Sequence, residues 1–135
     1  MTSDIIRVPI NDITDIICAR LTVRREAARI GFSTADQTRV ATAVSEIARN
    51  VINYATAGVC TLRDESTVDE LHLQVTIEDH GPGIPHVAEA MRDGYSTGGG
   101  LGAGLPGTRR LVNKFSIESR SGYTRVTFSL MRKRS

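Results

Sequence analysis

Residues 94–107 read Gly-Tyr-Ser-Thr-Gly-Gly-Gly-Leu-Gly-Ala-Gly-Leu-Pro-Gly and hold seven of the chain's twelve glycines. Residues 108–112, Thr-Arg-Arg-Leu-Val, follow at once and have the pattern of a helix. Because glycine has no Cβ, several backbone N–H groups of such a turn can approach one anion. The start of a helix adds further N–H groups and the positive end of its dipole. The stretch therefore predicts a phosphate-binding turn.

Glycine-rich runs also serve as flexible linkers, which is the plain alternative for this stretch. Leu101 and Leu105 interrupt the run, and a packed loop needs such residues whereas a spacer does not. The stretch matches neither common phosphate loop. No Gly-Lys-Ser/Thr follows the glycines, and Gly100-Leu-Gly-Ala-Gly104 is too compressed for the dinucleotide-binding motif.

Size and composition limit what the chain can be. With 135 residues and 40% apolar content, residues 1–135 are expected to form a single domain with its own core. A net charge of +2 gives no reason to expect nucleic acid as a partner. We expect no membrane association and a cytoplasmic protein, because the sequence shows neither a signal peptide nor a run of eighteen apolar residues. Cys18 and Cys60 are isolated and are expected to be buried free thiols.

The first half of the chain predicts an edge strand and two helices. Residues 6–10 alternate apolar and other residues around Pro9, which a strand tolerates at a sheet edge. A first helix, capped by Asn11 or Asp12, should run to about Ile30 and end at Gly31. Its expected inner face consists of Ile13, Ile16, Ile17, Val23, Ala27 and Ile30.

A second helix should start at Ser33, with Asp36 in a capping position, and reach about Ala57. Its apolar stripe is Val40, Val44, Ile47 and Val51. Three polar residues, Glu46, Asn50 and Asn53, fall within a sector about 60° wide beside that stripe. Polar groups that flank a buried face can line the edge of a cavity. The alternative for them is an ordinary solvated helix face.

The second half predicts two hairpins. Residues 59–63 and 71–78 form the first, and residues 115–120 and 123–131, around Ser121-Gly122, form the last. Between them, Asp79-His-Gly-Pro-Gly-Ile-Pro85 forces a sharp turn, and residues 87–91 suggest a short helix. Hairpins in place of βαβ crossovers indicate an α/β sandwich of the α+β class, with helices layered on one face of a mixed, mostly antiparallel sheet.

Three motifs in this order resemble a known superfamily. Residues 46–53, Glu-Ile-Ala-Arg-Asn-Val-Ile-Asn, resemble its N box, Asp79-His-Gly-Pro-Gly83 its first glycine box, and residues 98–104 its second. The superfamily is that of the GHKL or Bergerat-fold ATP domains of gyrase, Hsp90, histidine kinases and mismatch-repair proteins. Each motif alone is weak, but the three together cover nearly the whole chain.

The resemblance implies ATP and Mg²⁺ as cofactors and gives a role to each matching residue. Asp79 would accept a hydrogen bond from the adenine amine, where a guanine would present a carbonyl, so ATP is selected over GTP. Asn50 would coordinate Mg²⁺, and Glu46 would act as general base. Arg49 and Asn53 would either touch phosphate or be solvated. The implied nucleotide-binding residues are Asn50, Asn53, Asp79, Gly81, Gly83, Ile84, Ser96, Thr97, Gly98, Gly99, Gly100, Leu101, Gly102, Ala103, Gly104 and Leu105.

The nearest resemblance within the superfamily is to the anti-sigma-factor-type serine/threonine kinases, and among them to the switch kinases of the stressosome. It implies phosphorylation of Ser or Thr on STAS-domain scaffold and antagonist proteins, followed by activation of a downstream phosphatase or other output enzyme through binding. Arg20 lies in a segment similar to one that related kinases use at protein contacts, or is an ordinary exposed arginine. Two alternatives stay open: an anti-sigma factor with kinase activity that binds a sigma factor directly, and a nucleotide-gated binding module without turnover.

Overall fold

The computed structural model describes residues 5–55, 57–81 and 104–134, which form five strands and three helices. Both hairpins and the first two helices lie where the sequence analysis expected them, with ends shifted by a few residues. The short helix expected at residues 87–91 lies outside the described residues. In chain order the elements are β1 (Ile5–Ile10), α1 (Ile13–Ile30), α2 (Thr34–Tyr54), β2 (Gly58–Asp64), β3 (Glu70–Asp79), α4 (Gly104–Leu111), β4 (Lys114–Arg120) and β5 (Tyr123–Lys133).

The strands form one sheet in the order β1-β2-β3-β5-β4. β1 is an edge strand, as Pro9 indicated, and Pro9 pairs with Val59. All pairings among the described strands are antiparallel, so the sheet is simpler than the mixed sheet expected from the sequence. The long β3–β5 pairing brings Asp79 opposite Thr124 and Glu70 opposite Lys133.

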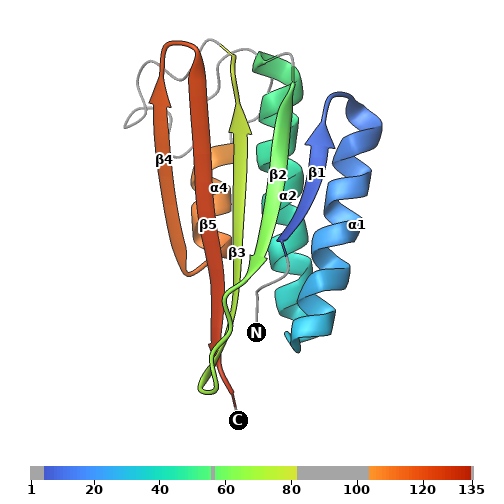
Figure 1. Ribbon diagram of the computed structural model, residues 1–135, viewed down its shortest axis with the longest axis vertical. Coiled ribbons are helices and arrows are strands. Elements are labelled where there is room, and N and C mark those ends of the chain that lie inside the picture. Colours follow the sequence, from blue (N-terminus) through green and yellow to red (C-terminus); the bar gives the residue numbers. More distant parts are fainter. Residues whose placement is uncertain (1–4, 56, 82–103, 135) are drawn as a thin grey trace.

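Helices cover one face of this sheet, which confirms the predicted sandwich (Figure 1). Side chains that alternate along each strand point into the helix layer, and α2 packs against both α1 and α4. The opposite face carries polar side chains such as Thr76, Thr127 and Glu118. The strand residues buried in the core are Val8, Ile10, Cys60, Leu62, Leu73, Val75, Ile77, Val126, Phe128 and Leu130.

α1 has the predicted caps but a different inner face. Asp12 caps its start in a reciprocal pair with Asp15, and Gly31 ends it at φ 118°, a left-handed conformation that suits glycine. Ile16, Val23 and Ala27 are buried as expected, and Ile30 is partly buried. The sequence prediction was wrong for Ile13 and Ile17, which are 69% and 46% exposed.

The prediction for the two thiols was half wrong. Cys60 is buried, and burial raises the pKa of its thiol to about 12, whereas Cys18 is exposed. The face of α1 that packs inward is filled by Ile16, Ala19 and Val23, and Cys18 points away from it. Among the described residues, no helix is both long and apolar enough to cross a membrane.

α2 is the central helix, and all four residues of its predicted stripe are buried: Val40, Val44, Ile47 and Val51. Ser33 caps its start by accepting a hydrogen bond from the backbone N–H of Asp36 at 3.2 Å. The Asp36 side chain itself is turned inward and only 6% exposed. The Asp36 carboxylate is therefore placed to bind partners on other elements as well as to start α2.

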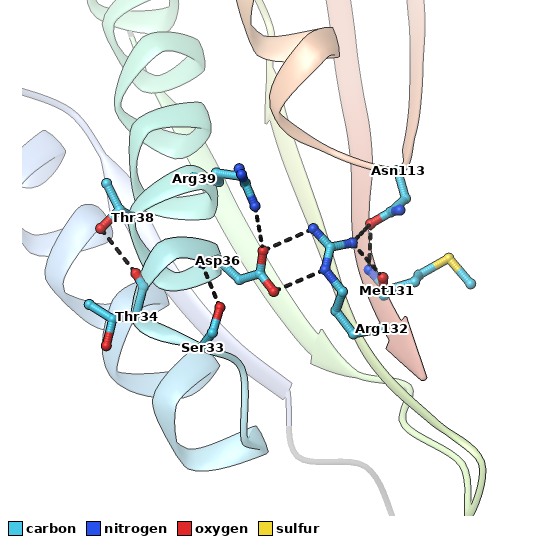
Figure 2. Close-up of polar contacts among 8 residues, drawn as sticks. All are labelled: Ser33, Thr34, Asp36, Thr38, Arg39, Asn113, Met131 and Arg132. Carbon is cyan, nitrogen blue, oxygen red and sulfur yellow. Dashed lines mark hydrogen bonds and ion pairs between the residues drawn. The ribbon is translucent and has the colours of Figure 1, made fainter. Parts of the chain in front are cut away.

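Arg132 of β5 reaches this carboxylate from 96 residues away (Figure 2). Its Nε and Nη2 atoms donate to the two Asp36 oxygens at 3.0 and 2.9 Å, and Arg39 donates a third bond at 2.9 Å. Asn113 accepts from the remaining Arg132 nitrogen at 3.0 Å. Burial alone would raise the pKa of Asp36, but the hydrogen bonds and charge of Arg132, with bonds from Arg39 and Ser33, hold it below its usual value.

Arg132→Ala should lower the free energy of unfolding at neutral pH by about 1–3 kcal/mol, because it leaves a buried carboxylate short of its bidentate partner. A lowered pKa means that this stabilisation is present above the pKa of the unfolded chain and is lost as pH falls through the folded-state pKa. In the variant the pKa of Asp36 rises, so the loss of stability on acidification should begin at higher pH. Urea unfolding at a series of pH values measures both effects.

Arg125→Ala is the matched control, because Arg125 lies on the same strand and pairs with Glu118 at 2.7 Å while both side chains are about half exposed. It should change stability by less than about 0.5 kcal/mol. Equal effects of the two variants would show that the Asp36–Arg132 pair adds nothing beyond a surface ion pair.

Candidate functional site

Asp79, the last residue of β3, forms one side of the candidate site. It lies opposite Gly58 on one neighbouring strand and Thr124 on the other, so its side chain shares the face that the helices cover. One carboxylate oxygen, Oδ1, accepts a hydrogen bond from the backbone N–H of Gly81 at 2.9 Å. That bond fixes the carboxylate relative to the turn that follows the strand.

Gly58 allows α2 to approach closely at this point. A Cβ on Gly58 would lie 2.6 Å from the Glu78 carbonyl oxygen, 2.9 Å from a methyl group of Val51 and 3.4 Å from the Asp79 Cβ. No side chain fits there without a shift. The turn of α2 that contains Val51 therefore rests directly on the Gly58–Asp79 pair, and Asn50 precedes Val51 in that turn.

The three polar residues predicted on α2 lie beside its buried stripe. Glu46 and Asn50 are half-buried, one turn apart, and Asn53 is exposed in the next turn. The Glu46 side chain is 27% exposed, and within the part of the chain that the structure describes it pairs with Arg49 at a loose 4.0 Å. Its carboxylate is thus accessible from the edge of the helix layer, as the chemistry of a base requires.

α4 begins at Gly104, four residues earlier than the sequence suggested, and packs against α2. Pro106 falls in its first turn, where a missing N–H costs nothing, and Thr108 is fully buried. In Figure 1 the ends of α2 and β3 lie at the upper end of the sheet, whereas α4 lies lower, at middle height, and leads down to the start of β4.

Gly104 and Leu105 thus belong to the first turn of α4 and Asn50 to α2, which packs against it. Asp79 ends β3, and Gly81 lies in the turn that follows. Other residues proposed for nucleotide binding lie outside the described residues: Gly83, Ile84, Ser96, Thr97, Gly98, Gly99, Gly100, Leu101, Gly102 and Ala103.

The described residues fit a magnesium ion that comes with a nucleotide. Within residues 5–55, 57–81 and 104–134 there is no group of three or more His, Cys, Asp or Glu that could hold a metal by itself. Asn50 offers one neutral oxygen, and Mg²⁺ commonly takes its other ligands from phosphate and water. Such a single amide oxygen suits a metal that is shared with phosphate.

Sequence reasoning missed two contributors to this end of the sheet. Gly58 belongs to no motif, and its close contact with Val51 depends on the tertiary packing of α2. Tyr123 was placed only as the start of a strand, but its hydroxyl donates to Glu78 Oε2 at 2.5 Å. One feature of the sequence pointed to Tyr123: it is the first residue after the Ser121-Gly122 turn. A residue at that position lies near the end of the neighbouring strand.

Comparison with known proteins bears on this geometry. The histidine kinase-like ATPase domain family matches residues 11–130. Serine/threonine-protein kinase RsbT of Bacillus subtilis (strain 168) is 46% identical over 108 residues, which cover 80% of this chain and 81% of that protein. The identity therefore extends over most of both proteins.

Solved structures share the fold at low identity. The RsbU and RsbW domains of Rv1364c from Mycobacterium tuberculosis superpose with a TM-score of 0.67 at 17% identity, over all of this chain and 34% of that one, so this chain spans about a third of it. The catalytic domain of histidine kinase ThkA gives 0.58 at 16% identity, over 95% of this chain and 97% of its own. The mycobacterial sensor histidine kinase MprB gives 0.58 at 17% identity, over 98% and 99%.

These structures support the fold alone, whereas the family match and the identity to RsbT each extend over most of the chain. By its sequence and its sandwich architecture, the chain belongs to the histidine kinase-like ATPase domain family, the GHKL superfamily that its three motifs resemble.

Proposed function

We propose that this protein is an ATP-dependent serine/threonine kinase that transfers the γ-phosphate of ATP to Ser or Thr of STAS-domain scaffold and antagonist proteins, and then activates a downstream phosphatase or other output enzyme by binding it. The observation that carries the proposal is the 46% identity to the serine/threonine-protein kinase RsbT over most of both chains. Two packing contacts support it, because the Val51 turn of α2 rests on the Gly58–Asp79 pair and α4 packs against α2.

Asp79 would recognise the adenine. Its Oδ1 atom is held by the Gly81 N–H, so Oδ2 can accept a hydrogen bond from the exocyclic amine. A guanine would place a carbonyl oxygen against the same carboxylate and leave two acceptors facing each other, which costs several kcal/mol (on the order of 1–3 for each unmet group). The site would therefore select ATP over GTP.

Glu46 would accept the proton of the attacking hydroxyl, or orient that hydroxyl, from its half-exposed place on α2. Asn50, one turn further along, would bind Mg²⁺, which when present neutralises phosphate charge. N–H groups at the start of α4 would bind phosphate oxygens. The residues thus divide into base recognition on β3 and phosphate chemistry on α2 and α4.

An exposed stripe on α1 supports the proposed binding to other proteins. Ile13, Ile17 and Leu21 are spaced four residues apart on one side of the helix and are 69%, 46% and 50% exposed. Arg20 and Arg24, both exposed, lie beside them. Three large aliphatic side chains in a row suit a protein contact better than water. With such partners and ATP, we also propose a cytoplasmic location.

Incubation with radiolabelled ATP, Mg²⁺ and a STAS-domain partner tests this function. The partner should acquire label on serine or threonine, and replacing its acceptor residue by alanine should abolish the label. The kinase without a partner serves as the control for self-labelling. Label on histidine, or no label on any STAS partner while ATP is bound, would contradict the proposal.

A further inference from the structure

The two residues that flank Asp79 are both held by one tyrosine. The Tyr123 hydroxyl donates to Glu78 Oε2 at 2.5 Å, and the Tyr123 ring packs on the His80 imidazole with ring centroids 5.5 Å apart. Glu78 and His80 lie on the face of the sheet opposite the helices, and Asp79 between them faces the helix layer. Tyr123 therefore contacts the end of β3 on the sheet face opposite the candidate site.

Strand register explains why this tyrosine reaches both neighbours. Asp79 is the last residue of β3 in the ladder, opposite Thr124, and Glu78 is opposite Arg125. Tyr123 precedes Thr124, so it stands beside His80, beyond the last paired residue, and diagonal to Glu78. Through the contact between Tyr123 and His80, β5 therefore interacts with the chain one residue beyond the end of the β3–β5 ladder.

The tyrosine is itself fixed by its own hairpin. It pairs with Arg120 across the β4–β5 turn, and the Arg120 guanidinium lies 4.7 Å from the centre of its ring. Gly122 supplies the positive φ, 86°, that this tight turn requires. The ring thus contacts both Arg120 and His80.

Asp79 can recognise a base only if its carboxylate keeps its direction. The Gly81 N–H holds Oδ1, but Gly81 lies two residues further along, past His80. If His80 were free, the turn that carries this N–H could shift relative to β3. The tyrosine contacts to Glu78 and His80 fix the backbone on both sides of the carboxylate.

We propose that Tyr123 is a positioning residue for adenine recognition, which orients Asp79 and the Gly81 N–H through Glu78 and His80 without touching the nucleotide. This inference rests on the proposed function, because it assumes that Asp79 binds adenine. The inference assigns nucleotide recognition and phosphate transfer to different residues. Tyr123 should govern the affinity and selectivity for the base, and Glu46 and Asn50 the transfer of phosphate.

Tyr123→Ala should weaken ATP binding by about tenfold and reduce the preference for ATP over GTP, because both neighbours of Asp79 lose their anchor. The KM for ATP should rise, while kcat at saturating ATP should stay within about twofold of the normal value, since Glu46 and Asn50, the residues proposed for phosphate transfer, are unchanged. Tyr123→Phe keeps the ring against His80 and loses only the bond to Glu78. It should retain most of the affinity. Calorimetric titrations with ATP and GTP, with steady-state kinetics, measure these values.

Thr127→Ala is the control, because Thr127 lies on the same strand and the same face, four residues away from the site. It should leave both nucleotide affinities unchanged. His80→Ala combined with Tyr123→Ala should bind ATP no more weakly than Tyr123→Ala alone, since the two residues act as one unit. A melting temperature measured for each variant separates loss of folding from loss of recognition.

Unchanged ATP affinity and unchanged ATP-to-GTP preference in Tyr123→Ala would overturn the inference. So would a variant that loses melting temperature and affinity for both nucleotides in equal proportion, because that is a purely structural effect. The proposed function fails separately, if the unaltered protein does not bind ATP.

Discussion

Asp79→Ala should lower ATP affinity by about tenfold to a hundredfold, which corresponds to the loss of one hydrogen bond to a charged acceptor, about 1.5–3 kcal/mol. The carboxylate is the one adenine-recognition group proposed among the described residues, and its Oδ1 is already committed to the Gly81 N–H. Kinase activity at ATP concentrations below saturation should fall in proportion. Titration calorimetry with ATP and Mg²⁺ measures the affinity directly.

Asp79→Asn tests in addition whether this carboxylate discriminates between ATP and GTP. A carboxamide has an N–H that can donate to a guanine carbonyl, so the variant should lose affinity for ATP and lose its discrimination against GTP. Asp69→Ala is the control, since Asp69 lies in the β2–β3 connection at the opposite end of the sheet. Its hydrogen bonds with Thr67 and Arg134 are made by its backbone N–H and carbonyl groups, which the substitution keeps. If Asp79→Ala binds ATP as the unaltered protein does, adenine is recognised elsewhere.

Glu46→Gln should reduce phosphate transfer to a STAS partner by about two to four orders of magnitude, the usual effect of removing a general base. ATP affinity should change by less than about threefold, because an amide keeps the size and polarity of the side chain. The fold should tolerate the change, since Glu46 is partly exposed and its Arg49 contact is long, at 4.0 Å. Single-turnover transfer at saturating ATP isolates the chemical step.

Thr42→Ala, one turn earlier and exposed on α2, provides the control for any change in that helix and should transfer phosphate normally. A Glu46→Gln protein that phosphorylates its partner at the normal rate would remove Glu46 from the mechanism. A protein that keeps its effect on the output enzyme while transfer is lost would show that binding and transfer are separable functions.

Local rules predicted the features that depend on a few neighbouring residues. The caps at Asp12 and Ser33, the end of α1 at Gly31 and the buried stripe from Val40 to Val51 follow from backbone N–H groups and helical periodicity. Glu46 and Asn50 lie beside that stripe, as helical spacing predicted, and Asp79 ends β3. Their roles at a nucleotide come from the resemblance to the superfamily motifs and stay predictions.

Features that depend on tertiary packing were beyond the same rules. Asp36 was recognised as a capping residue, yet its carboxylate is bound by Arg132, 96 residues later in the chain. Ile13 and Ile17 fit a helical stripe, but α1 packs against α2 and the sheet through Ile16, Ala19 and Val23 and leaves them exposed. Gly58 and Tyr123 matter through their neighbours on other elements, so no pattern in the sequence singles them out.

The proposed site requires that Asp79 on β3 and Asn50 on α2 act together on one adenine nucleotide. Calorimetric titration of the unaltered protein with ATP and with GTP, each with Mg²⁺, measures this. We expect saturable heat for one ATP per chain, a weaker interaction when Mg²⁺ is withheld, and little or no binding of GTP. No heat with ATP, or equal affinity for the two nucleotides, would contradict it.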